Sequence, residues 1–246
     1  MPNYNGQKFI KESICAFIDS SWPNKELIIV DGKSSDASHS IIHEFAEKNE
    51  CIIWVKELDC GISDAINIGI RSCSGNVIGY LGNDDLLLKD TLSKVAEYKK
   101  LLNFDGIYFD SYTYDYKLNT TRNRACPELE FTKNSLLKFG TIVGLQNIFF
   151  SAYIFDNFKY DIKNKYSMDY EFYFRVLEKY NHFIHIKNPS SINIAHDNIS
   201  NALSEKQSKE AFQVAQRHIN TVVDFCALYF NKRTLKSFVK FWGDSK

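Results

Sequence analysis

Three short, continuous runs of apolar residues recur in the first hundred positions. They lie at 26–31, 51–56 and 76–81, and such runs are typical of strands that helices cover on both faces. Apolar residues at helical spacing lie around them: Ile10, Ile14 and Phe17; Ile41, Ile42 and Phe45; Ile62, Ile66 and Ile70; Leu92, Val95 and Leu102. Helices that join successive buried strands predict parallel pairing with right-handed crossovers. We therefore expect a Rossmann-like α/β layer over residues 1–104, with a mainly parallel sheet between helices.

The second half of the chain has a different pattern. Residues 106–124 alternate aromatic and polar side chains around a turn at 117–120, which is typical of a small antiparallel ribbon. The elements expected after the ribbon are a helix at 134–138, a strand at 147–150, a helix capped by Ser167, strands at 182–187 and 191–195, and a helix at 205–230. The whole pattern predicts one domain over residues 1–230, divided into 1–104 and 105–230, and a tail at 231–246.

Composition limits the class of protein. A chain of 246 residues fits one substantial domain. Lys and Arg number 30, as do Asp and Glu, so no net charge points to a nucleic acid partner. The six cysteines show no CxxC pair, which favours reduced thiols in the cytoplasm. No run of eighteen apolar residues and no signal peptide is visible, so we expect a soluble protein or one attached to a membrane surface.

Two adjacent carboxylates follow the apolar run at 76–81. Asp84 and Asp85 stand where a buried strand ends, and ligands of open α/β sheets lie beyond the carboxyl ends of the strands. Neighbouring carboxylates repel each other unless a cation or a hydrogen-bonded ligand offsets the repulsion, and Mg²⁺ or Mn²⁺ takes oxygen ligands. The alternative is a helix N-cap ahead of the apolar pattern that begins at Leu88, since Asp is a common N-cap residue.

Five ordered motifs carry a resemblance to a known family. They are PNYNG at 2–6, VDGKSSD at 30–36, ELDCGISDAINIGI at 57–70, GNDD at 82–85 and SMDYE at 167–171. In this order and spacing the chain resembles the family 2 glycosyltransferases, which have the GT-A fold. The resemblance implies a site for a nucleotide-diphosphate-sugar donor in residues 1–104 and an acceptor site in residues 105–230.

The resemblance also implies roles for individual residues in the donor half. Asp85 matches the metal ligand, with Mn²⁺ or Mg²⁺ as cofactor, and Asp84 matches a residue that contacts the ribose or sugar of the donor. The base and ribose are implied to be lined by Tyr4, Asn5, Asp31, Asp59 and Asp64. Taken alone, Tyr4 could equally be a turn residue and Asp31 a cap of the following loop.

Three further residues are candidates in the acceptor half. Asp169 matches the family's acid at a helix start and is the candidate general base for the acceptor hydroxyl, because inverting sugar transfer needs a positioned carboxylate. A first-turn aspartate favoured by the helix dipole is the alternative. His196 is expected to reach the diphosphate or the metal, or else to be a surface-loop histidine. Gln146 is expected to contact the acceptor, or else to be a polar residue at a strand edge.

The chain departs from the family pattern at three places. Relatives have an apolar strand before the PxYN loop, whereas here Met1 directly precedes Pro2, so the first strand of the sheet is expected to be missing. Without that strand, backbone groups of the neighbouring strands lack hydrogen-bond partners, and the loop that carries Tyr4 is weakly anchored. Cys60 stands where many relatives have Lys or Arg, and Lys33 replaces a small residue; both bear on donor affinity.

The expected function is transfer of a sugar, with inversion, from a UDP-sugar to a hydroxyl of a saccharide acceptor. The resemblance implies an acceptor on a polyprenyl diphosphate carrier in O-antigen or capsule synthesis. Basic and aromatic residues at 232–246 fit peripheral contact at the cytoplasmic face of the membrane. One rival is a non-catalytic or truncated nucleotide-sugar-binding relative. Another is a nucleotidyltransferase, whose Gly-rich, Lys/Arg-bearing loop is not visible here.

Overall fold

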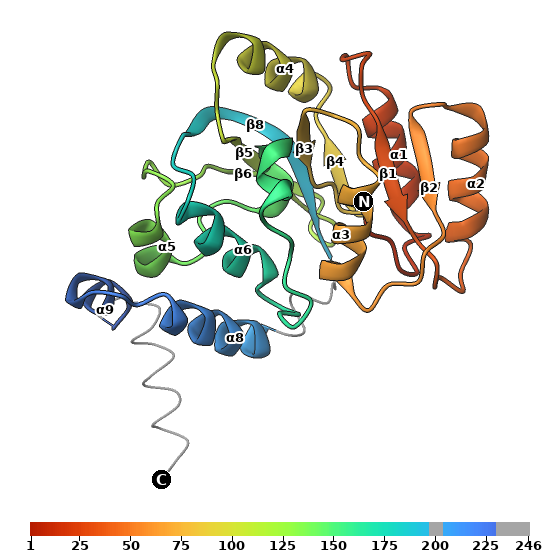
Figure 1. The fold of residues 1–246 in the computed structure, drawn as a ribbon. Coiled ribbons are helices and arrows are strands. Elements are labelled where there is room, and N and C mark those ends of the chain that lie inside the picture. The colour runs from red at the N-terminus through yellow and green to blue at the C-terminus, as the bar shows by residue number, and fades with distance from the viewer. Residues whose placement is uncertain (197–203, 230–246) are drawn as a thin grey trace.

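The computed structural model describes residues 1–196 and 204–229, arranged as two sheets with helices on both sides (Figure 1). The smaller sheet pairs β1 (Leu27–Val30) with β2 (Ile52–Val55) in parallel. The larger sheet contains β3 (Val77–Gly79), β4 (Asp85–Leu87), β5 (Gly106–Asp115), β6 (Thr120–Arg124), β7 (Ile148–Ser151) and β8 (Phe183–Ala195). Its order is β3-β7-β5-β8-β4, with β6 paired to β5.

Helices occupy both faces of these sheets (Figure 1). They are α1 (Ile10–Ile18), α2 (Ser38–Lys48), α3 (Ile62–Arg71), α4 (Thr91–Leu101), α5 (Lys133–Phe139), α6 (Met168–Leu177), α8 (Ser204–Arg217) and α9 (Val222–Tyr229), with 3-10 turns η1 (Leu145–Asn147) and η2 (Ala152–Asp156). None of the helices in this described part combines the length and apolarity that crossing a membrane requires.

The longest pairing in the molecule is the parallel one between β5 and β8, from Gly106 opposite Phe183 to Asp115 opposite Ala195. Antiparallel pairs join β3 to β7, β7 to β5, β5 to β6 and β4 to β8. The α/β fold class is confirmed, as are the parallel β1–β2 pair and the antiparallel ribbon. The ribbon turns at Asn119, whose φ of 52° suits an asparagine.

Strand β5 separates the two main parts of the core because its side chains alternate between its faces. Ile107 and Phe109 pack with α1, β1, α2 and α4, whereas Tyr108 packs with the aromatic cluster of β7, α5 and α6. In that cluster Tyr160 stacks on Phe172 with ring centroids 4.2 Å apart. The division of the chain into halves at residue 104 stays a prediction.

Two expected boundaries and the bonding of one expected cap differ from the structure. The strands at 182–187 and 191–195 are one strand, β8, because a bulge opposite Asp110 absorbs the step at Pro189. The helix expected at 205–230 is two helices, because Asp224 accepts bonds from the Asn220 and Thr221 amides and starts α9 anew. Ser167 is the N-cap residue of α6, as expected, but its side chain makes no capping bond; its hydroxyl donates to the Gln207 carbonyl.

Strands β1 and β3 are not paired with each other. The two strands belong to different sheets, and among the described residues only Pro2 approaches β1 from this side, as an isolated parallel bridge to Val30. Val30 N donates to Met1 O at 2.9 Å, and Asn3 N donates to Val30 O at 2.9 Å. The chain thus enters the fold beside β1 through a very short ladder.

Gly79 in β3 allows the packing of β3 against β7 to be tested. A Cβ added there lies 2.5 Å from Cδ1 of the Phe149 ring, so Gly79→Ala should overpack the sheet and lower the free energy of unfolding by about 1–3 kcal/mol. Urea denaturation measures this. The control is Gly69→Ala in α3, where the added Cβ meets Val30 at 3.4 Å and helix propensity favours Ala by about 1 kcal/mol. Equal midpoints for both variants would contradict the prediction.

Candidate active site

The loop that holds Tyr4 and Asn5 lies against the loop that follows β1. Nδ2 of Asn3 donates to Oδ2 of Asp31 at 2.5 Å, and the Asn5 amide donates to the Ser34 hydroxyl at 2.8 Å. Asn5 has a φ of 51°, a conformation that Asn adopts more readily than most residues. These contacts leave Tyr4 with 66% of its surface exposed. The structure therefore brings Tyr4, Asn5 and Asp31 together, with Tyr4 and Asn5 exposed and Asp31 buried.

Asp31 is fully buried, and both of its carboxylate oxygens accept hydrogen bonds. Besides Asn3, the donors are the Ser34 amide at 3.0 Å, the Lys33 amide at 3.2 Å and Nε2 of His39 at 3.1 Å. Burial alone would raise the pKa of Asp31, but the hydrogen bonds from Ser34, Asn3 and His39 outweigh it and hold the pKa below its usual value. The carboxylate is ionised and anchors the two loops.

A second asparagine connects these loops to the GNDD segment. Nδ2 of Asn83 donates to Oδ1 of Asn3 at 2.6 Å. The contact requires Gly6, because a Cβ at that position would collide with the side-chain amides of both asparagines. The GNDD segment is thereby held beside the PNYNG loop, although 80 residues separate Asn3 from Asn83.

The two acids of the GNDD segment have different partners. Asp84 Oδ2 lies 2.8 Å from Nε2 of His196, and Asp85 Oδ1 accepts from Nδ2 of Asn193 at 2.9 Å. Neither aspartate caps a helix: Asp85 begins β4, which pairs with β8, and the N-cap residue of α4 is Asp90. Gly82 permits the turn, since a Cβ there would lie 2.5 Å from Asp85 Oδ2 and 2.9 Å from Asp84 Oδ1.

The chemistry of this group fits a hard divalent cation. Burial raises the pKa of Asp85 to about 7, the Asn193 bond opposes the shift and the charge of Asp84 adds to it. Oδ1 of Asn193 is buried and has no hydrogen-bond partner among the described residues. Two carboxylates and an unpartnered amide oxygen match the oxygen ligands that Mg²⁺ and Mn²⁺ take. Such an ion would favour the ionised form of Asp85.

Asp169 lies in the electrostatic field of the same site. Burial raises the pKa of the Tyr80 phenol well above its usual value, and the charges of Asp85, Asp84 and Asp169 raise it further. All three acids therefore act on the charge of the Tyr80 phenol. Burial also raises the pKa of Asp169, whose Oδ1 accepts from the Tyr170 amide at 2.8 Å.

The remaining predicted residues lie around this centre. Asp59 and Asp64 share one turn before α3: Asp59 accepts from the Gly61 amide and Asp64 from the Cys60 amide, each at 2.9 Å. Lys33 crosses to this turn and donates to the Asp59 carbonyl. Gln146 lies in η1 and is half-buried. No contact between Gln146 and the acids is seen in the described part of the chain, so its role stays a prediction.

A separate group of possible metal ligands lies elsewhere on the larger sheet. Asp110 of β5, Cys126 and His185 of β8 have ligand atoms within 4.8 Å of one another. Asp110 Oδ1 accepts from the Cys126 amide at 2.8 Å and lies 2.9 Å from Nε2 of His185. Burial, with the charge of Asp110, raises the pKa of the Cys126 thiol to about 11. Hydrogen bonds within this group account for its arrangement.

Comparison with known proteins decides the family. The family described as "Glycosyl transferase family 2" matches residues 1–160, which contain the PNYNG loop, Asp31 and the GNDD segment. The chain belongs to glycosyl transferase family 2. This confirms the resemblance that the ordered motifs carry.

Two curated relatives match less than half of this family 2 chain. Glycosyltransferase GlyA of Streptococcus pneumoniae is 29% identical over 106 residues, which are 43% of this chain and 15% of the relative. The putative teichuronic acid biosynthesis glycosyltransferase TuaG of Bacillus subtilis is 30% identical over 99 residues, 39% of each protein. The matched part is thus well under half the length of either relative.

Solved structures resemble the chain along almost its whole length. S. aureus TarS 1–349 in complex with UDP-GlcNAc has a TM-score of 0.72 at 14% identity, covering 98% of this chain and 71% of TarS. The mannosyltransferase PcManGT of Pyrobaculum calidifontis, in complex with GDP-Man and Mn²⁺, has a TM-score of 0.69 at 14% identity, covering all of this chain and 74% of PcManGT. At this identity the likeness shows the fold, and it confirms the GT-A expectation.

Sequence reasoning missed several residues that organise this family 2 site. Asn3 and Asn83 lie inside motifs that were recognised, but nothing local indicates that they contact each other. Asn193 lies within β8 and becomes a partner of Asp85 only through the pairing of β4 with β8. The spacing gives no signal for Asn193. Tyr80, in contrast, lies next to the acids in sequence.

The buried Asp31 predicts how stability depends on acid pH. Its folded-state pKa lies below that of the unfolded chain, so its contribution is complete above about pH 4 and is lost as pH falls through the folded value. Asp31→Asn should lower the free energy of unfolding at pH 7 by about 1–3 kcal/mol and flatten its decline below pH 4. Urea titrations from pH 2.5 to 7 measure both effects. The control is Asp19→Asn, an exposed acid at the end of α1. An unchanged acid slope in Asp31→Asn would contradict the assignment.

Proposed function

We propose that this chain transfers a sugar from a nucleotide-diphosphate-sugar to a hydroxyl of a saccharide acceptor, with inversion and a divalent metal ion. The observation that carries the proposal is the placement of Asp84 against His196 and of Asp85 against Asn193, in a segment that the Asn3–Asn83 bond holds beside the loop exposing Tyr4. A UDP-sugar is the proposed donor, in keeping with the TarS complex, while the PcManGT complex holds a guanosine donor.

The donor half supplies positions for the nucleotide. Tyr4 is exposed on a loop fixed by Asn5 and by the Asn3–Asp31 bond, and aromatic faces stack on bases. Asp31 acts through the loop that it anchors. Asp59 and Asp64 shape the turn at the start of α3. Lys33 donates to the Asp59 carbonyl and so connects the loop after β1 with this turn.

Asp84 and Asp85 are proposed to face the diphosphate. Asp85 and His196 would hold Mn²⁺ or Mg²⁺, and Asp84, oriented by His196, would contact the ribose or the sugar. When bound, the ion supplies Lewis-acid stabilisation of the leaving diphosphate. Burial of Asp85 and the unpartnered Asn193 oxygen both favour binding of positive charge at this position.

Asp169 is proposed as the general base. Burial raises its pKa, so its carboxylate is a better proton acceptor than an ordinary aspartate. It would take the proton of the acceptor hydroxyl as that oxygen attacks from the face opposite the diphosphate. Gln146 is proposed to contact the acceptor.

The acceptor is proposed to be a lipid-linked saccharide of a bacterial surface polymer, such as an O-antigen or capsule unit. The name of TuaG refers to the biosynthesis of teichuronic acid, a surface polymer. Peripheral attachment at the cytoplasmic face would use the basic and aromatic residues at 232–246. These residues lie outside the part of the chain that the structure describes.

The donor class can be tested by thermal shift. UDP, GDP, dTDP and CMP are each added with and without Mn²⁺, and one of them, UDP by our proposal, should raise the melting temperature only with metal. At a hundred times Kd the rise is about 5–10 °C. Asp85→Asn should abolish the metal-dependent rise. Asp90→Asn, an exposed acid at the start of α4, should keep it.

The general base can be tested by turnover. Asp169→Asn should bind the selected donor with unchanged Kd but release nucleoside diphosphate about 10²–10⁴ times more slowly in the presence of acceptor saccharides. Asp156→Asn, an exposed acid after β7, is the matched control and should turn over normally. Turnover of Asp169→Asn near the parent rate would remove Asp169 from the mechanism.

A second candidate function is nucleotide-sugar binding without transfer. The observation that favours it is the weak attachment of the PNYNG loop, which in the described part of the chain pairs with β1 only through a short ladder. Any sustained turnover of donor by the purified chain would exclude it. Donor binding with metal and no turnover in the presence of acceptors would favour it over the enzyme.

A further inference from the structure

One face of the larger sheet carries a polar row that starts at Asp85. The register pairs Asp85 of β4 with Asn193 of β8, and Asn193 with Thr113 of β5. It pairs Thr113 in turn with Arg122 of β6. Directly paired residues project from the same face of a sheet, as the 2.9 Å bond from Asn193 Nδ2 to Asp85 Oδ1 illustrates. Arg122 therefore stands on the face that carries Asp85, which we call the Asp85 face.

A second row lies beside the first and also ends in an arginine. The register pairs Ser111 of β5 with Arg124 of β6. Residues two apart along a strand share a face, so Arg124 stands on the same face as Arg122. The alternate residues of β6, Thr121 and Asn123, are neutral and belong to the opposite face. The positive charge of β6 is therefore confined to the Asp85 face.

The side chains of the two arginines are open to a ligand. Strand β6 is exposed along its whole length, and neither Arg122 nor Arg124 forms an ion pair with another residue in 1–196 or 204–229. Asp115, on the same face of β5, is engaged at the tip of the ribbon, where its Oδ1 accepts from the amides of Lys117 and Leu118 at 3.0 Å each. Two cationic forks thus face solvent at the end of the polar rows.

The position of the arginines separates them from the diphosphate of the donor. Neighbouring strands lie about 4.8 Å apart, so three strand spacings put the backbone of Arg122 about 14 Å from that of Asp85. This interval leaves space for a saccharide between the guanidinium groups and a diphosphate bound at Asp85. Both arginines also lie in residues 105–230, the half of the chain proposed to bind the acceptor.

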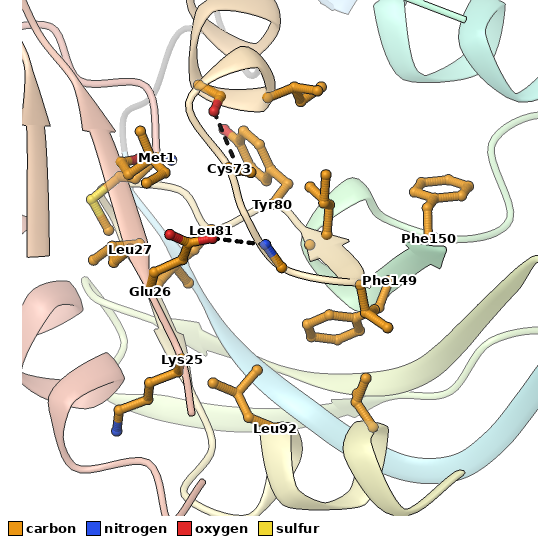
Figure 2. Close-up of a pocket in the computed structure, with 18 of the residues that line it drawn as sticks. Met1, Lys25, Glu26, Leu27, Cys73, Tyr80, Leu81, Leu92, Phe149 and Phe150 are labelled. Carbon is orange, nitrogen blue, oxygen red and sulfur yellow. Dashed lines mark hydrogen bonds between the residues drawn. The ribbon is translucent and has the colours of Figure 1, made fainter. Parts of the chain in front are cut away.

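The cavity between β1 and β3 has a different chemistry. Its volume is about 830 Å³, and its mostly apolar walls include Leu27, Leu81 and Phe149 (Figure 2). Burial of a charged saccharide beside such walls is unfavourable, because the charge loses its hydration. The exposed cationic end of the Asp85 face is a better place for an anionic group.

We propose that Arg122 and Arg124 bind an anionic group of the saccharide acceptor, a phosphate or a carboxylate, and so select charged acceptors over neutral ones. This role rests on the transfer reaction proposed above and names the chemical class of its acceptor. A guanidinium presents a planar fork of donors that matches both anions in bidentate geometry. The alternative is that charge on an edge strand only prevents pairing with another strand, a role that either face of β6 would serve.

Binding of small saccharides to the 246-residue chain tests this role. The protein is loaded with UDP and Mg²⁺, so that the donor site is occupied, and ligand-observed NMR measures Kd for glucose 1-phosphate, glucuronic acid and methyl glucoside. At least one anionic probe should bind about tenfold or more tightly than the neutral glucoside. Arg122→Gln/Arg124→Gln should remove this preference and leave Kd for methyl glucoside unchanged. A preference for the 1-phosphate indicates the phosphate that joins a saccharide to its carrier, and one for glucuronic acid indicates a carboxylate of the sugar chain.

The matched control moves the two charges to the other face of the same strand. Thr121→Arg/Asn123→Arg, added to the double Gln variant, restores the net charge and a charged edge strand. It should not restore the preference for anionic probes. Restoration would overturn the proposal in favour of a general attraction between charges, and so would a preference that survives in the double Gln variant.

Failure of this role and failure of the proposed function give different results. UDP with Mg²⁺ should raise the melting temperature of the parent and of all variants equally. If it does so and the parent binds charged and neutral probes with equal Kd, or binds none of them, the role of the arginines alone is overturned. If UDP with Mg²⁺ does not stabilise the parent, the transfer function is contradicted, and the acceptor role with it.

Discussion

The side-chain amide of Asn3 is the contact on which the geometry of the site depends. It donates to Asp31 and accepts from Asn83, so it ties together the PNYNG loop, the loop after β1 and the GNDD segment. A neutral hydrogen bond contributes about 1 kcal/mol, and one to a charged group about 1.5–3 kcal/mol. Asn3 is itself placed by the bonds of Met1 and Asn3 to Ile28 and Val30, so a few bonds at the start of the chain position three loops.

The buried carboxylates serve opposite purposes because their surroundings differ. Asp31 receives donors on both oxygens and stays ionised without any ligand, which suits a residue that organises loops. Burial raises the pKa of both Asp85 and Asp169, and their local hydrogen bonds do not compensate fully. A carboxylate whose charge is not compensated by hydrogen bonds is stabilised most when a cation or a proton binds to it. The same contrast separates a structural aspartate from those proposed to do chemistry.

Local patterns predicted the elements well, and long-range pairing explains most of what they missed. The apolar runs identified β1 and β2, and the alternation after residue 105 identified the β5–β6 ribbon. No local pattern could show that Asp85 starts a strand of its own, since β4 exists through its pairing with β8. Asn193 was missed for the same reason. The break before α9 did have a local signal, because Thr221 and Asp224 form the spacing of a capping box.

The attachment of residues 1–7 connects the two candidate functions, enzyme and binding protein, through one equilibrium. A ligand binds only the molecules in which its site is assembled, so the apparent Kd rises as the assembled fraction falls. Residues 1–7 form the Tyr4 side of the site, and in the described part of the chain a short ladder to β1 and side-chain bonds to the loop after it hold them. Weakening these bonds would lower the assembled fraction, while Asp84, Asp85 and Asp169 stay where β4, β8 and α6 place them. The positions of the three acids and the affinity for the donor are therefore separate properties of this fold. A weak donor affinity alone would not argue against catalysis.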